Sequence, residues 1–251
     1  MMSQGLSVEA LEILVNVTLS SARVLPLFIM LPFLSGSTVT GLFKFPLAAL
    51  IGYSLWYPPE NIYKEFEVVD YLWALCKEVI VGTCIAIILS FPFWVMHAVG
   101  SYIDNQRGAT ISSVLSPQSG IDASELANFF NMLSVALILA AGGILQMLNV
   151  LQHSYEIWPP LTDKLPSYTV FFGFLTELIS SAIRLSAPVV TVFLICELIL
   201  GLMGRYTPQL NPFSLALSLK TLIGFGVLFI YFTPVLPEEI VALTDKFHLT
   251  R

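Results

Sequence analysis

Five charged side chains border or interrupt the apolar runs of this sequence: Glu78, Glu177, Arg184, Glu197 and Lys220. A charge at the centre of a membrane-spanning helix costs roughly 2.5–3.5 kcal/mol, so each is expected to have a partner or a purpose. One interpretation is a path for ions or protons. The other is a set of ion pairs between helices or subunits in a protein-lined interface. No acidic cluster suggests a proton relay, so the sequence favours ion pairs for assembly.

Signatures of catalysis are absent from the sequence. It contains no HExxH, no GxSxG and no GxxxxGK[ST] motif. Its three histidines lie far apart, and its three cysteines sit in apolar stretches without the spacing of a disulfide framework. We therefore expect no enzyme activity, no metal site and no cofactor.

Composition defines where such a chain can fold. Hydrophobic residues make up 56% of the 251 residues and charged residues 11%, against about 25% charged in an average soluble domain. Mean hydropathy is +0.83. The net charge is −6, and no basic run could follow a phosphate backbone. A soluble fold and a nucleic-acid binder are thereby excluded, and a bilayer or a large apolar assembly is indicated.

Charge-free runs then predict the elements that carry these residues. The two longest cover 79–103 and 126–155, 25 and 30 residues, and a membrane-spanning helix needs about 20. The runs are too long for strands and do not alternate. We expect an all-α integral membrane-type protein, one helical subunit over 1–251, with kinked or broken apolar helices near 8–33, 39–57, 66–103, 122–152, 167–203 and 212–234.

Prolines interrupt several of these predicted helices, at Pro26, Pro32, Pro92 and Pro188. Each removes a backbone donor and favours a kink. In lipid, the carbonyls freed in this way need partners from protein or water. We therefore expect the helices to pack against other protein along much of their length. Lys and Arg are spread almost evenly among the connectors, so the sequence does not predict an orientation.

The longest polar stretch of the interior, 101–122, separates the two longest apolar runs. A capping pattern from Asp122 to Glu125 predicts that the next helix begins there. Loops of this length are uncommon and often functional. It could also be an ordinary solvent-exposed connector. Its candidate functional residues are Asp104, Asn105, Gln106, Arg107, Gly108, Ile111, Val114, Leu115 and Pro117.

Two further motifs, taken with their order along the chain, carry a family resemblance. Residues 100–108 read GSYIDNQRG and look like a G-x-x-(I/L)-D-x-x-R-G motif. A second pattern, G-L-x-x-R-x-x-P-Q-x-N-x-F followed by a lysine, is matched by Gly201, Leu202, Arg205, Pro208, Gln209, Asn211, Phe213 and Lys220. Other landmarks in register are Arg23 with Pro26 and Pro32, Lys44, Glu78 with Gly82, Gly142-Gly143, and Ser154-Tyr155 before Pro159.

Together these motifs resemble the T/R component of the type III secretion export gate over nearly the whole chain. This is the SctT family of injectisomes, with the FliR family as its flagellar counterpart. Two tripeptides, Pro92-Phe93-Trp94 and Ser154-Tyr155-Glu156, look more like injectisome members than flagellar ones.

The resemblance implies a non-enzymatic subunit that lines and gates a channel for unfolded secreted substrates. It implies partners of the R/P, S/Q and U/B types in a helical assembly, with lipid around it and no nucleic acid. It implies a place in the bacterial inner membrane, within the base of the secretion system, with an extension to the periplasmic side. The loop 101–122 matches a loop that helps plug the closed pore.

A polytopic secondary transporter for a small solute or ion is the alternative. Transporters of that kind show internal repeats with matched broken helices. The predicted helices 66–103 and 167–203 each carry a proline within the run, but their flanks do not otherwise match. An intramembrane enzyme is disfavoured by the absent signatures.

Overall fold

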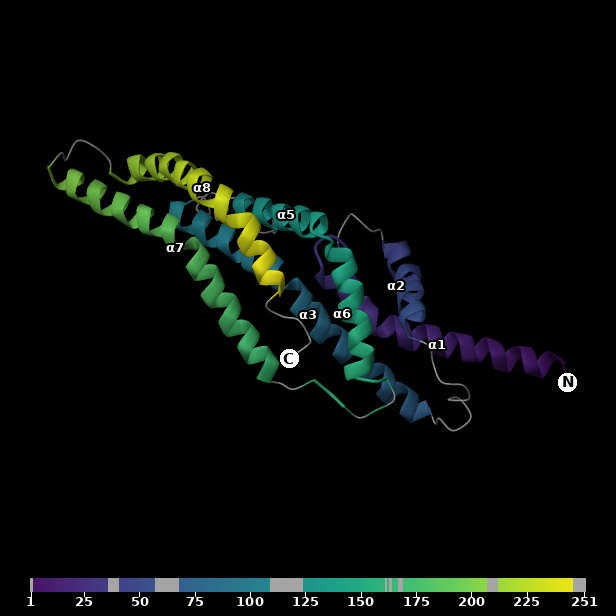
Figure 1. The fold of residues 1–251 in the computed structure, drawn as a ribbon. Coiled ribbons are helices and arrows are strands. Elements are labelled where there is room, and N and C mark those ends of the chain that lie inside the picture. The colour runs from purple at the N-terminus through teal and green to yellow at the C-terminus, as the bar shows by residue number, and fades with distance from the viewer. Residues whose placement is uncertain are drawn as a thin grey trace. The chain divides into compact units, whose positions relative to one another are not determined.

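The computed structural model describes residues 2–35, 41–56, 68–108, 124–160, 162, 164–166, 169–206 and 212–245. Across these ranges the chain forms helices and no strand, which confirms the predicted all-α class. In chain order the helices are α1 (Met2–Met30), α2 (Gly41–Leu55), α3 (Val68–Arg107), α5 (Glu125–Ala140), α6 (Gly143–Ile157), α7 (Thr169–Tyr206) and α8 (Pro212–Asp245) (Figure 1).

Four helices of the described ranges are long and apolar enough to cross a membrane. They are the Ile13–Met30 part of α1, all of α3, and most of α7 and α8. The broken pair α5 and α6 would make a fifth span if it were counted as one. Helix α2, with 15 residues, falls short of the length that a span requires. These helices confirm the membrane class that the composition predicted.

Several predicted boundaries are wrong, each for a local reason. The expected helix 122–152 is two helices, because Gly142 adopts the left-handed conformation (φ +87°) that ends a helix. Its start is Glu125, with Ser124 as the N-cap, rather than Asp122. Helix α3 continues to Arg107, so 101–107 is helix and not loop. Helix α8 runs through Pro234 and Pro237 to Asp245.

Three of the four prolines expected to interrupt helices are accommodated within them. Pro26, Pro92 and Pro188 lie inside α1, α3 and α7, and the helical assignment continues on both sides of each. Helix α1 ends at Met30, before Pro32. Pro26, Pro92 and Pro188 therefore lie inside long helices, whereas Pro32 follows the end of one.

The chain divides into two compact units, which the sequence did not predict. Unit 1 comprises Met1–Ser90, Gly142–Phe171 and Phe247–Arg251, and unit 2 comprises Phe91–Ala141 and Phe172–Lys246. In unit 1, α2 packs along α1, and a core forms around Leu19, Trp56, Ala74 and Tyr155 (Figure 1). In unit 2, α5 packs on α8, where the ring centroids of Phe130 and Phe232 lie 5.1 Å apart.

Glycines allow helix backbones to approach closely within each unit. A Cβ atom placed on Gly82 of α3 would lie 2.2 Å from the carbonyl oxygen of Arg23 on α1. One on Gly52 of α2 would lie 2.5 Å from the carbonyl oxygen of Ser20, and one on Gly100 would lie 2.5 Å from Cα of Ala127. Small residues at such crossings are typical of helix contacts in membranes.

We expect Gly82→Ala to force α1 and α3 apart, because the atom that it meets belongs to rigid backbone. The melting temperature of the complex with partner subunits and the yield of the chain from membranes should both fall. Gly226→Ala is the matched control, since a Cβ atom there meets nothing within 4 Å. A Gly82→Ala protein as stable as the Gly226→Ala protein would contradict the close contact.

Candidate functional site: two buried polar clusters

The polar cluster of unit 1 is built around an ion pair between α1 and α3. The guanidinium of Arg23 donates from Nε to Oε2 of Glu78 at 2.6 Å and from Nη2 to Oε1 at 3.0 Å. The exposed fractions of these side chains are 0% and 1%. A two-pronged contact of this kind is the strongest geometry for an arginine and a carboxylate.

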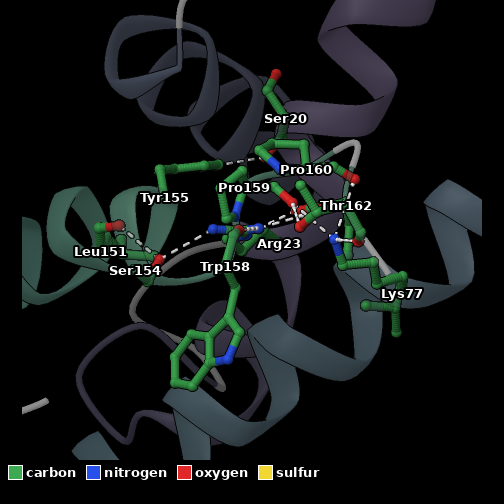
Figure 2. Close-up of polar contacts among 12 residues, drawn as sticks. Ser20, Arg23, Lys77, Leu151, Ser154, Tyr155, Trp158, Pro159, Pro160 and Thr162 are labelled. Carbon is green, nitrogen blue, oxygen red and sulfur yellow. Dashed lines mark hydrogen bonds and ion pairs between the residues drawn. The ribbon is translucent and has the colours of Figure 1, made fainter. Parts of the chain in front are cut away.

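Helix α6 and the residue after it supply further partners for Arg23. Its Nη1 donates to Oγ of Ser154 at 3.2 Å, and its Nη2 donates to the carbonyl oxygen of Trp158 at 2.7 Å. The Tyr155 ring covers the guanidinium, with its centroid 4.0 Å from Cζ. Figure 2 shows Ser154 and Tyr155 beside Arg23. The desolvation cost of a buried charge is thus offset by several bonds, and one residue joins α1, α3 and α6.

Lys77, beside Glu78 on α3, forms the second part of the unit 1 cluster. Its side chain is buried, and its Nζ donates to the carbonyl oxygens of Pro159 at 2.7 Å, Pro160 at 3.3 Å and Thr162 (Figure 2). Backbone carbonyls beyond the end of a helix need donors from elsewhere. The ammonium group of Lys77 donates to these carbonyls and so fixes the chain that follows α6.

The polar cluster of unit 2 is centred on Asp104, which is fully buried. Its carboxylate accepts bonds from Nε of Arg107 at 2.7 Å, from Oγ of Ser124 at 2.7 Å and from the backbone N–H of Leu126 at 3.0 Å. Oγ of Ser124 accepts in turn from the N–H of Ala127. A carboxylate at a helix N-terminus satisfies free N–H groups and is favoured by the helix dipole. Asp104 therefore joins the end of α3 to the start of α5.

This position corrects the sequence prediction for the loop residues. Asp104, Asn105, Gln106 and Arg107 form the last turn of α3, and Gly108 follows with a φ of +78°. The side chain of Asn105 is exposed. The other four candidates, Ile111, Val114, Leu115 and Pro117, lie outside the described residues.

Lys220 of α8 completes the unit 2 cluster. Its Nζ donates to Oε1 of Glu197 on α7 and to the carbonyl oxygen of Gln106 at 3.1 Å. The guanidinium of Arg107 lies over the ring of Phe225, with Cζ 5.4 Å from the centroid. Helices α3, α5, α7 and α8 all contribute to this cluster.

The five charges selected from the sequence fall into two groups. Glu78 and Lys220 are buried, and each has an oppositely charged partner. Glu177 is half-buried, while the side chains of Glu197 and Arg184 are 49% and 58% exposed in the single chain. Burial of Arg184 and Glu197 in an assembly stays a prediction.

The signature residues lie around the junction of α7 and α8. Gly201 and Arg205 are exposed near the end of α7, and Phe213 is in the first turn of α8. Pro208, Gln209 and Asn211 lie outside the described residues. Lys220, the lysine that follows this signature, joins the unit 2 cluster.

Sequence reasoning missed Lys77 and the pairing of Arg23 with Glu78. One signal was available: Arg23 is the only charged residue between Ile13 and Phe43. A lone cation in such a run needs an acidic partner, and Glu78 opens one of the two longest apolar runs.

Arg184 has its partner on another helix of the same chain. Its Nη2 lies 3.5 Å from Oε2 of Glu239 on α8. Exposed pairs of this kind contribute little to stability. We expect Arg184→Ala to leave the helicity and melting temperature of the assembled complex unchanged and to lower the yield of that complex. Arg184→Lys should lower the yield less, and Glu239→Gln serves as the control. Normal complex yield from Arg184→Ala would show that Arg184 faces solvent.

The described residues contain no group of three His, Cys, Asp or Glu side chains that could hold a metal ion. The two clusters instead pair cations with anions and with backbone carbonyls. These bonds hold together helices that are distant in the sequence.

The fold and the clusters define a class: a polytopic α-helical membrane protein whose helices are fastened by buried ion pairs. Within this class, the family of bacterial export proteins, family 1, matches residues 14–246. The chain belongs to this family.

Three relatives show the range of the similarity. Surface presentation of antigens protein SpaR of Salmonella typhimurium is 37% identical over 243 residues, 97% of this chain and 92% of that protein. Yop proteins translocation protein T of Yersinia pestis is 28% identical over 225 residues, 87% and 86% of the two chains. Flagellar biosynthetic protein FliR of Bacillus subtilis is 27% identical over 194 residues, 75% and 73%.

Proposed function

We propose that this chain is a non-enzymatic core subunit of a type III protein secretion apparatus, in which it lines and gates the export channel. Membership of the export family supports the role in secretion. Identity to the presentation protein SpaR, at 37%, exceeds identity to the flagellar protein FliR, at 27%, and this supports an injectisome rather than a flagellum. The substrates are unfolded secreted proteins.

The length of the helices is the observation that carries the proposal. Helices α3 and α7 have 40 and 38 residues, which is roughly 60 and 57 Å at about 1.5 Å per residue. The hydrocarbon core of a bilayer is about 30 Å thick. Lipid can therefore cover only part of each helix, and the remainder must meet protein or water.

The surface of α7 supports a protein neighbour. Glu197 is half exposed between Leu194 and Leu198, which are 54% and 65% exposed. Exposure of a carboxylate to lipid costs free energy, and so does exposure of leucine side chains to water. A helix of another subunit meets both needs. We infer partners of the R/P, S/Q and U/B types, in the bacterial inner membrane with an extension to the periplasmic side.

We further propose that segment 109–123 acts as a plug of the closed channel. Its sequence combines apolar Ile111, Val114 and Leu115 with serines, Gln118 and Gly120. Apolar residues exclude water and ions, while weak packing lets a substrate displace the segment. The bonds of Asp104 to Ser124 and Leu126 hold the two flanking helix ends together, which supports a tethered segment.

Expression with and without partners tests the assembly role. Produced alone, the chain should aggregate or be degraded, because its exposed apolar helices and charges lack their neighbours. Coexpression with the other gate subunits should restore a soluble complex in detergent, measured as the yield of full-length chain after size exclusion. A well-behaved monomer with full helicity and a sharp melting transition would contradict the proposal.

A further inference from the structure

Tryptophan and tyrosine side chains gather around one level of unit 1. Trp56 of α2 and Tyr155 of α6 belong to the same buried core, and Tyr71 of α3 packs against it. Trp73 follows on α3 and is 58% exposed. Rings with an apolar body and a polar group collect where a bilayer meets water. This level of unit 1 therefore has the composition of a membrane–water boundary.

The two tyrosines use their hydroxyl groups inside the unit. The hydroxyl of Tyr71 forms a hydrogen bond with Oγ1 of Thr18, and that of Tyr155 lies 3.5 Å from the carbonyl oxygen of Ser20. Trp73 is instead exposed and belongs to the surface of α3.

The side chains of α3 near Trp73 form one exposed and apolar surface. We name this surface the α3 outer face, and its members are Leu72, Trp73, Cys76, Val79 and Ile80. Steps of three and four residues place such side chains on one side of a helix. The α3 outer face extends about 12 Å along the helix, at about 1.5 Å per residue.

The charges in this part of α3 are turned away from the outer face. Lys77 and Glu78 are the only Asp, Glu, Lys or Arg residues of 71–103, and both are buried. Thr83 donates from Oγ1 to the carbonyl oxygen of Val79 at 2.7 Å, so its hydroxyl is satisfied within the helix. Lipid tails offer no partner to a charge or a hydroxyl, and here neither needs one.

Other exposed faces of the described helices carry charges. Glu197 of α7 is half exposed, and His153 and Glu156 form an exposed pair on α6. Charges of this kind need water or protein as neighbours. The absence of charge thus distinguishes the α3 outer face.

The size of the side chains separates lipid from a partner helix. Helices that pack together in membranes use small residues at their contact. On α3 the small residue Gly82 lies at the crossing with α1, where its backbone approaches Arg23. The α3 outer face instead carries large aliphatic side chains and a tryptophan, which suits lipid tails better than a closely packed helix.

We propose that the α3 outer face is a lipid-contact surface, and that Trp73 marks the level at which the hydrocarbon of the bilayer begins. Lipid tails cover Cys76, Val79 and Ile80, while Asp70, exposed in the first turn of α3, lies on the water side. This inference rests on the membrane class of the fold rather than on the export role. It assigns to lipid one part of a helix that is too long for lipid to cover throughout.

Spin labels along α3 test the inference in the complex with partner subunits, embedded in a lipid bilayer. The labelled positions, one in each sample, are Val69→Cys, Leu72→Cys, native Cys76 and Ile80→Cys. All other cysteines of the complex are replaced by alanine, and Trp73 is retained. Each label is measured for its collision rate with oxygen, which partitions into lipid tails, and with a nickel chelate, which stays in water.

The ratio of the oxygen rate to the nickel rate should change along the helix. We expect a ratio below one at position 69, close to one at 72, above one at 76 and highest at 80. Glu156→Cys on α6 is the matched control. Ser154 of α6 and Glu78 of α3 both contact Arg23, so the control label lies at a similar depth. It should lack the excess of oxygen.

Three results would overturn the inference and leave the export role untouched. Low rates with both reagents at 72–80 would show that a partner subunit covers the face. An excess of nickel at 76 and 80 would show that water covers it. An oxygen excess at 69 equal to that at 80 would remove Trp73 as the boundary. Because Cys76 is native, its label tests the face even where a substitution lowers the yield of the complex.

Discussion

Replacing Arg23 with methionine should destabilise unit 1 by about 3–5 kcal/mol, the cost of leaving a buried charge without its partner. The side chain of Glu78 is 1% exposed, so its carboxylate would stay buried without the arginine that neutralises its charge. Ser154 and the carbonyl of Trp158 would lose a donor at the same time. We expect lower melting temperature and lower yield of the complex.

A double substitution separates the stranded charge from the loss of contacts. Arg23→Met with Glu78→Leu removes both charges, and apolar replacement of a whole buried pair is often near neutral. It should therefore recover much of the stability that Arg23→Met loses. Glu156→Gln is the matched control, because Glu156 and His153 form an exposed pair on α6, with side chains 66% and 49% exposed. If Arg23→Met melted at the temperature of Glu156→Gln, the buried pair would not stabilise the unit.

Deleting 109–119 should leave the complex assembled and make the membrane permeable to small ions. Assembly should survive because Asp104, Ser124 and Leu126 still join α3 to α5. The four remaining residues, 120–123, can span roughly 13–14 Å when extended. Dye uptake by cells that make the full apparatus measures the leak. Replacement of 109–119 by a Gly-Ser segment of equal length is the control, which keeps the length and removes Ile111, Val114 and Leu115.

The sequence predicted the class of the fold because apolar runs of 25 and 30 residues leave few other structures possible. It did not predict the break between α5 and α6. Residues 126–155 contain no Asp, Glu, Lys or Arg, and the left-handed φ of Gly142 separates the two helices. Likewise, the polarity of 104–107 resembled a loop, whereas the bonds of Asp104 make these residues the end of a helix.

Local spacing in the sequence does not identify the partners of the charged residues, because tertiary packing sets them. Arg23 and Glu78 are 55 positions apart, and Arg23 and Trp158 are 135 apart. No local spacing relates such residues. The sequence also treated Glu78 and Arg184 alike, although the first is 1% exposed and the second 58%. Burial depends on which helices lie against each face, which periodicity alone does not fix.

Ionic conductance of the purified complex in a planar bilayer tests most directly whether this chain gates an export channel. Complexes with the unchanged chain, with the 109–119 deletion and with the Gly-Ser replacement would be compared at equal amounts of assembled protein. We predict that the unchanged complex is closed, that the deletion complex conducts, and that the replacement conducts at least in part. A deletion complex that is fully assembled and as tight as the unchanged one would contradict the gating role.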